Sequence, residues 1–107
     1  MKIRVVKFDP KSNEWTEHQI TGGKLGEYYR LIGCTTIDIV ALNHNLDVYV
    51  DDEGLLVDNP IMSMVMGNGI VRQLAGVLVF TGGADKDGNT VGCTYDIEAL
   101  KHAVLSF

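Results

Sequence analysis

The stretch GCTTIDIVALNHNLDVYVDDEGLLVDNP, residues 33–60, decides the fold class of this chain. Residues alternate with a period of two within 36–41 (TIDIVA) and again within 46–51 (LDVYVD). This period is typical of antiparallel strands that turn one face to a core and leave the other partly solvated. The acidic turn at 51–54 (DDEG) ends the second strand. Asn59-Pro60 closes the stretch, because the residue before a proline is disfavoured in the helical region.

The segments before this stretch predict a hairpin and a short helix. Residues 2–8 (KIRVVKF) and 15–21 (WTEHQIT) have strand composition and flank the turn-rich residues 9–13. They therefore predict a β-hairpin. In 24–33 (KLGEYYRLIG) the apolar residues fall at helical spacing, and Gly33 stands where such a helix should stop.

The segment that follows the opening stretch predicts another short helix. Asn59 suits the N-cap position, Pro60 suits the first helical position, and the apolar residues of 61–65 fall on one face. Residues 67–69 (GNG) then end this helix.

The last third of the chain predicts a buried strand and a C-terminal helix. Residues 76–81 (GVLVFT) form a continuous apolar run of strand length, typical of a central strand. After a loop at 82–89, residues 96–107 have apolar positions at helical spacing, with Thr94 or Asp96 as the cap. The fold class predicted for the whole chain is α+β, with about five mainly antiparallel strands and two or three short helices.

Length and composition indicate one small domain that spans residues 1–107. Hydrophobic residues make up 46% and charged residues 21%, which is ordinary for a globular protein in solution. Apolar runs are interrupted well before the roughly 18 residues that a membrane helix needs, and the N-terminus lacks the pattern of a signal peptide. We therefore expect a cytoplasmic protein, in the host cytoplasm if it is phage-encoded, with Cys34 and Cys93 as reduced thiols.

The charge balance bears on the kind of partner. The formal net charge is −5 and the basic residues are scattered along the chain. A protein that binds a phosphate backbone across a broad face needs clustered lysine and arginine, so we expect no direct contact with a nucleic-acid backbone.

The candidate metal and catalytic residues do not form a complete motif. Asp85, Asp87 and Asn89 begin like the calcium loop of an EF-hand, but Thr90 stands where a glycine must make the sharp turn. A solvated loop is the alternative. The three histidines share no ligand spacing, and no local signature pairs a histidine with either cysteine or a serine. We therefore predict a non-enzymatic protein without a cofactor, a metal site or catalytic residues.

Two groups of residues could bind a partner, and each has a structural alternative. The first group consists of the acidic residues at 51–53 and 58, which can form a negatively charged contact patch or simply a solvated turn. The second group consists of the tyrosines at 28 and 49 and the arginines at 30 and 72. The tyrosines can stack on a ligand whose negative charge the arginines bind, or the tyrosines can belong to the core. Alternating methionines at 62, 64 and 66 indicate an adaptable apolar surface or ordinary packing. The predicted binding residues are Tyr49, Asp51, Asp52, Glu53, Asp58, Tyr28, Arg30 and Arg72.

Residues 33–92 resemble a family of small uncharacterised proteins of bacteriophages and mobile elements that share a domain of unknown function. The resemblance rests on the run from Gly33 into IDIVAL and on YVDDEG at 49–54. It continues with Asn59-Pro60 before an apolar segment and with GVLV at 76–79 before a glycine-rich acidic loop.

The resemblance implies phage accessory biology, in which small proteins commonly disarm host machinery by binding to it. The leading hypothesis is a protein that blocks a host component, such as a defence protein, through its acidic surface. One alternative is the sequestration of a small anionic ligand such as a signalling nucleotide, and a second is an uncharacterised enzyme. A homodimer paired through an exposed strand edge is also expected.

Overall fold

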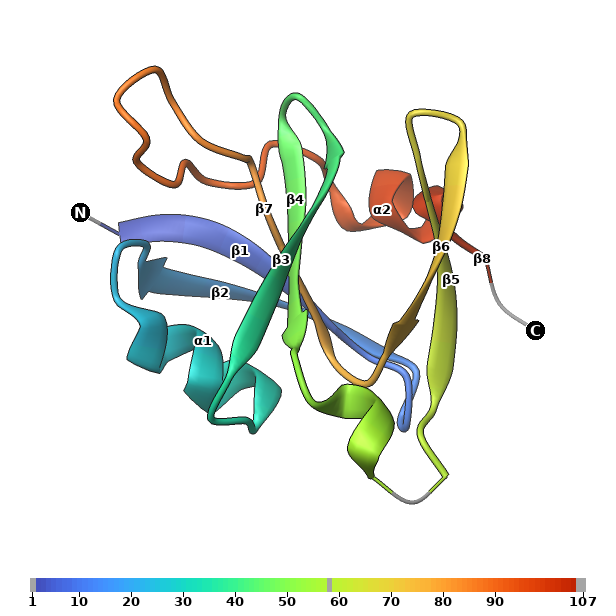
Figure 1. Cartoon of the computed structure of the whole chain (residues 1–107). Coiled ribbons are helices and arrows are strands. Elements are labelled where there is room, and N and C mark those ends of the chain that lie inside the picture. Colours follow the sequence, from blue (N-terminus) through green and yellow to red (C-terminus); the bar gives the residue numbers. More distant parts are fainter. Residues whose placement is uncertain (1, 58, 106–107) are drawn as a thin grey trace.

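The computed structural model describes residues 2–57 and 59–105, and a five-stranded antiparallel sheet lies at its centre (Figure 1). Its strand order is β2-β1-β7-β4-β3, so each of the two hairpins lies on one side of β7. The five strands are β1 (Lys2–Asp9), β2 (Glu14–Thr21), β3 (Ile37–Asn43), β4 (Leu46–Asp51) and β7 (Leu78–Thr81).

A smaller, three-stranded sheet and three helical segments complete the fold. The strand order of the small sheet is β6-β5-β8, and all of its pairings are antiparallel. Its strands are β5 (Met62–Gly67), β6 (Ile70–Ala75) and β8 (Val104–Leu105). The helical segments are α1 (Leu25–Ile32), the 3₁₀ turn η1 (Gly54–Leu56) and α2 (Ile97–Ala103).

The middle strand, β7, is buried on both faces. Each of its four residues has 0% of its surface exposed. Alternate side chains of a strand point to opposite faces, so this strand needs a core on each side of the sheet. The prediction of a buried central strand in 76–81 is confirmed.

The two cores lie on opposite faces of the large sheet. On one face α1 packs against Val5, Ile20, Tyr49 and Val79 through Tyr28 and Leu31. On the other face the small sheet and α2 cover the sheet through Val65, Leu74 and Leu100. The molecule is therefore layered, with α1 on one side of the large sheet and the small sheet with α2 on the other (Figure 1).

Helix α1 ends, and helix α2 begins, where the sequence predicts. Gly33 ends α1 in the left-handed conformation, with φ of 79°, and the Cys34 N–H donates to the Tyr29 carbonyl at 3.1 Å, as in a Schellman motif. Asp96 caps α2, because its carboxylate accepts a hydrogen bond from the Ala99 N–H at 2.7 Å.

The predicted helix over 61–65 is wrong, because this segment is strand β5. Asn59 has φ of 52°, which an N-cap does not adopt, so Asn59-Pro60 forms a bend before the strand. Asn68 and Gly69 have φ of 51° and 75° and join β5 to β6 as a two-residue hairpin turn. Positive φ at both positions is the type I′ geometry that favours Asn-Gly.

The C-terminal helix is also shorter than predicted. It ends at Ala103, and the chain continues as β8, where Val104 lies opposite Val65 of β5. Phe107, which the sequence places on the same helix face, lies outside the described residues. The additional strands β5, β6 and β8 are the reason why the structure has more strands than the five expected.

The large sheet has two edge strands, β2 and β3. β3 is the last strand in the order, and the Asp38 carboxylate accepts a hydrogen bond from the neighbouring Ile39 N–H at 3.0 Å. Homodimerisation through a strand edge stays a prediction.

Gly67 of β5 packs directly against the backbone of Leu42 in β3, and an added methyl group should push the two strands apart. A Cβ at Gly67 would lie 2.5 Å from the Leu42 carbonyl oxygen, closer than such atoms approach. We expect Gly67→Ala to reduce the free energy of unfolding by about 1–3 kcal/mol. Urea unfolding followed by the fluorescence of Trp15, the single tryptophan, measures the change.

Gly23→Ala is the matched control, since nothing lies within 4 Å of a Cβ at that position. We expect its free energy of unfolding to stay within about 0.5 kcal/mol of the wild-type value. Equal stabilities for Gly67→Ala and Gly23→Ala would contradict the close contact between β5 and β3.

Candidate functional site

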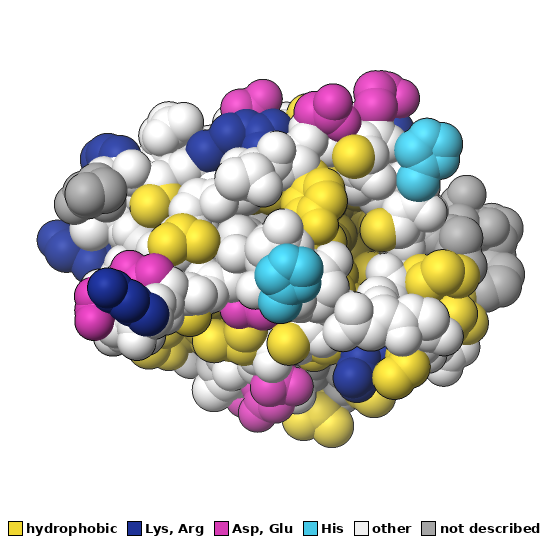
Figure 2. All heavy atoms as spheres, turned by 90° about the horizontal axis from the view of Figure 1, so that it is seen from above, with side chains coloured by type: hydrophobic (Ala, Val, Ile, Leu, Met, Phe, Trp, Pro, Cys, Tyr) yellow, Lys and Arg dark blue, Asp and Glu magenta, His cyan; other side chains and the backbone are white. Residues whose placement is uncertain are grey.

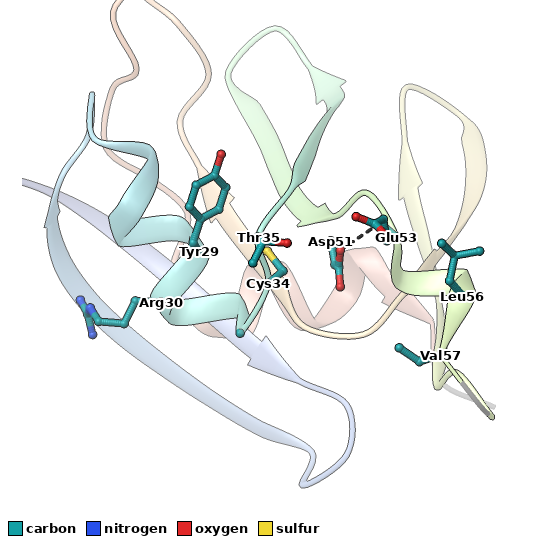
Figure 3. Close-up of a pocket in the computed structure, with 9 residues that line it drawn as sticks. Tyr29, Arg30, Cys34, Thr35, Asp51, Glu53, Leu56 and Val57 are labelled. Atoms are coloured by element: carbon teal, nitrogen blue, oxygen red, sulfur yellow. Dashed lines mark hydrogen bonds between the residues drawn. The ribbon is translucent and has the colours of Figure 1, made fainter.

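An open pocket lies at one end of the large sheet, between the C-terminal end of α1 and η1 (Figure 3). We call it the main pocket. Its volume is about 580 Å³, and its walls are the end of α1, residues 33–35, the carboxylates of Asp51 and Glu53, and residues 56–57. The walls therefore come from segments that the sheet and α1 bring together from separate parts of the chain.

The acidic turn after β4 is held in one shape by three hydrogen bonds. The Glu53 N–H donates to Asp51 Oδ1 at 2.9 Å, which is the dashed line in Figure 3. The Thr36 hydroxyl donates to Glu53 Oε1 at 3.2 Å, and the Asp52 N–H donates to the Thr36 carbonyl at 3.2 Å. These contacts hold both carboxylates on the wall of the main pocket.

The main pocket has a negative electrostatic character. Arg30, the one cationic side chain among the described residues that line it, points away from Asp51 and Glu53 in Figure 3 and pairs with Glu27 at 3.4 Å. Among residues 2–57 and 59–105, neither Asp51 nor Glu53 forms an ion pair. Two carboxylates that no cation pairs with in this part of the chain favour a positively charged ligand over an anion.

An apolar ridge borders the pocket. Leu55, Leu56 and Val57 follow one another in the chain with 68%, 78% and 56% of their surfaces exposed. A second hollow of about 170 Å³, the small pocket, shares Asp51 and Val57 with the main pocket and is otherwise mostly apolar, with Ile32, Ile61 and Val77 in its wall. We call the two pockets and the ridge between them the 51–61 surface.

Of the predicted binding residues that the structure describes, four lie at or beside this surface and three lie elsewhere. Arg30, Asp51 and Glu53 line the main pocket, and Asp52 is exposed on the same turn. Arg72 is exposed on β6, in the small sheet on the opposite face of the large sheet from α1. Asp58 lies outside the described residues.

Tyr28 and Tyr49 belong to the core. Their rings stack with centroids 4.1 Å apart, and the Tyr28 hydroxyl donates to the Gly22 carbonyl at 3.1 Å. Tyr28 is fully buried and Tyr49 is 4% exposed, so neither ring can stack on a ligand at the surface. Burial raises the pKa of Tyr28 well above its ordinary value. These two residues join α1 to β4 and thereby position the wall of the main pocket.

Sequence reasoning missed the apolar ridge as a contact surface. Leu55-Leu56-Val57 stands between DDEG and DNP, two turn-forming groups, and shows no period of two. Three large apolar residues inside a turn-rich segment are a signal that could have identified it, because such a segment has no element of its own to pack into a core.

In the candidate calcium loop, the carboxylate of the first residue, Asp85, accepts hydrogen bonds from the backbone of the same loop. Asp85 Oδ1 accepts hydrogen bonds from the Asp87 and Asn89 N–H groups, each at 2.9 Å, and the contacts lower the pKa of Asp85. In the part of the chain that the structure describes, no group of three or more histidine, cysteine, aspartate or glutamate side chains could hold a metal ion. The hydrogen bonds of Asp85 are those of a self-contained turn, which is the arrangement that the solvated-loop alternative predicts.

The two thiols are free, and the environment of Cys34 does not activate it. Burial and the nearby Asp51 carboxylate raise the pKa of Cys34, and burial raises the pKa of Cys93. A raised pKa keeps a thiol protonated at neutral pH and lowers its reactivity as a nucleophile. No histidine is among the described residues that line the main pocket.

Charged side chains are mixed on the face that carries the tips of the β3–β4 and β5–β6 hairpins. Figure 2 shows lysine and arginine spread among acidic and apolar side chains there. A binding site for a nucleic-acid backbone needs a basic patch, and this face does not present one over its described residues. Of the described helices, none has the length and apolar character needed to cross a membrane.

The sequence profile of a domain of unknown function, DUF3846, matches residues 1–104. The chain belongs to this family. No curated protein and no solved structure matches the chain. This match confirms the expectation of an uncharacterised family, and it covers nearly the whole chain. The motifs proposed over 33–92 as the mark of that family stay a prediction. The association of this DUF3846 chain with phages and mobile elements stays a prediction.

The chemistry of Cys34 tests the geometry of the main pocket in this DUF3846 chain. Because the Asp51 charge raises the pKa of Cys34, we expect Asp51→Asn to lower that pKa, though burial still holds it above the ordinary value. The rate of alkylation by iodoacetamide should then rise at a lower pH than in the wild type. Mass spectrometry of peptides separates Cys34 from Cys93, which is buried and should react slowly in both proteins. An unchanged rate–pH profile would show that Asp51 does not face the thiol.

Proposed function

We propose that this protein is a non-enzymatic binding protein that docks on a partner protein through the 51–61 surface and thereby blocks the partner. The observation that carries the proposal is the ridge Leu55-Leu56-Val57, where each of three consecutive apolar side chains is more than half exposed. Scattered exposed apolar residues are normal, whereas a contiguous group bordered by polar residues is typical of an interaction site.

The charge around the ridge supports a basic partner. Asp51, Asp52 and Glu53 lie beside the ridge, and the chain carries a formal net charge of −5. Complementary charges speed up association and select partners. A host protein that binds nucleic acid has a basic surface by necessity, so such a protein is the partner class that this surface fits best.

The biological setting of the proposal follows from the resemblance to phage and mobile-element proteins. In this setting the protein acts in the host cytoplasm and disables a nucleic-acid-binding host protein, such as a defence factor. The alternative of a small anionic ligand has less support, because carboxylates outnumber the guanidinium group in the main pocket.

The proposal is tested by capture from a lysate of the cells that carry the gene. We expect the wild type to retain one basic protein in stoichiometric amount at about 50 mM salt and to lose most of it at several hundred millimolar, because salt screens the charges. The double variant Leu55→Ser/Leu56→Ser should bind that protein at least about tenfold more weakly, as expected for buried apolar contacts at an interface.

The double variant Ile70→Ser/Val71→Ser is the matched control. These two residues are also exposed and apolar, with 54% and 42% of their surfaces accessible, but they lie on β6. Binding that survives in Leu55→Ser/Leu56→Ser, or that is lost equally in the control, would contradict the proposal. A bound species of nucleotide mass in native mass spectra of the purified protein would favour the anionic-ligand alternative.

A further inference from the structure

We infer that the partner docks with a short segment that places a basic side chain in the main pocket and a neighbouring large apolar side chain in the small pocket. This inference rests on the proposed function and gives the chemical class of the segment that the 51–61 surface accepts. It follows from three features of the surface: its free carboxylate oxygens, its two hollows and the ridge that joins them.

The carboxylates leave oxygens available to a ligand. Asp51 uses Oδ1 to accept the Glu53 N–H, and Glu53 uses Oε1 to accept the Thr36 hydroxyl. Over residues 2–57 and 59–105 the second oxygen of each carboxylate forms no hydrogen bond to the protein. The hydrogen bonds fix the two groups in place, so a cation that enters does not have to order them first.

A basic side chain matches this arrangement better than a metal ion does. A calcium ion takes about 6–8 oxygen ligands, and a magnesium ion needs near-octahedral geometry, whereas the main pocket offers two carboxylates. A guanidinium or ammonium group donates several hydrogen bonds in different directions and can contact both carboxylates at once. The volume of about 580 Å³ leaves room for the stem of such a side chain along Leu56 and Val57.

The small pocket supplies the apolar half of the recognition. Ile32, Ile61 and Val77 lie in its wall, and Val57 stands between it and the main pocket. The wall is tied together by the hydrogen bond from the Gly76 N–H to the Ile61 carbonyl at 2.9 Å. The volume of the small pocket, about 170 Å³, suits one large side chain. Because the two pockets share Asp51 and Val57, the basic and the apolar residue of the partner must be close neighbours in sequence or lie on one face of a helix.

A displayed library of random 12-residue peptides, selected on the full chain, is the probe. We expect the selected peptides to share an arginine or lysine within four residues of Leu, Ile, Met or Phe. Synthetic copies of the best peptides are then titrated against the protein by fluorescence anisotropy. Asp51→Asn/Glu53→Gln should weaken their binding at least tenfold, and Leu55→Ser/Leu56→Ser should weaken it similarly.

Two controls distinguish a direct contact between the peptide's basic side chain and the carboxylates of Asp51 and Glu53 from the effects of net charge or of poor folding. Glu14→Gln/Asp87→Asn removes the same number of charges from exposed positions elsewhere and should leave binding within about twofold, because exposed distant charges are largely screened. Replacing the basic residue of the peptide with a neutral one, citrulline for arginine, tests the same contact on the wild-type protein, so a variant that folds poorly does not decide the result.

The outcomes distinguish this inference from the proposed function. Peptides without a basic residue that depend on Leu55 and Leu56 but not on Asp51 and Glu53 would overturn the inference and leave the proposed function standing. Basic peptides that bind Asp51→Asn/Glu53→Gln as tightly as the wild type would also overturn the inference. If no selected peptide depends on any of these four residues, the inference and the proposed 51–61 docking surface both fall.

Discussion

The double-sided burial of β7 is the constraint on which the rest of this structure depends. A strand of four residues, all fully buried, cannot form the middle of a sheet that has one face in water. Val79 requires the cover that α1 provides, and Leu78 with Phe80 requires the cover of the small sheet and α2. The three layers of this small domain are therefore the response to one short apolar segment.

Much of this fold can be predicted from the sequence because the local signals agree with the tertiary structure. The first hairpin, the end of α1 at Gly33 and the burial of β7 follow from turn chemistry and hydrophobic pattern. The region after Pro60 was mispredicted because a proline suits both a helix start and a bend before a strand. There, the alternating methionines and the Asn68-Gly69 turn were the better guide.

Only part of the candidate site can be recognised from the sequence. The acidic residues at 51–53 stand out as turn-forming carboxylates, but their position beside α1 depends on which strands pair. Tyr28 and Tyr49 have the composition of a binding platform, and only packing shows that they stack on each other inside the core. The exposure of Leu55-Leu56-Val57 was signalled only by the position of three apolar residues inside a turn-rich segment, and this signal is weak because apolar residues are usually expected to find a core.

The position of β7 between the two hairpins also has a consequence for how the chain is made. The hairpins β1–β2 and β3–β4 each pair residues close in sequence, yet they meet in the large sheet only through a strand that begins at Leu78. On the ribosome, the chain must therefore emerge as far as Thr81 before the sheet can close. Until then the two hairpins lack the strand that joins them, and their inner edges stay open to pairing with other chains.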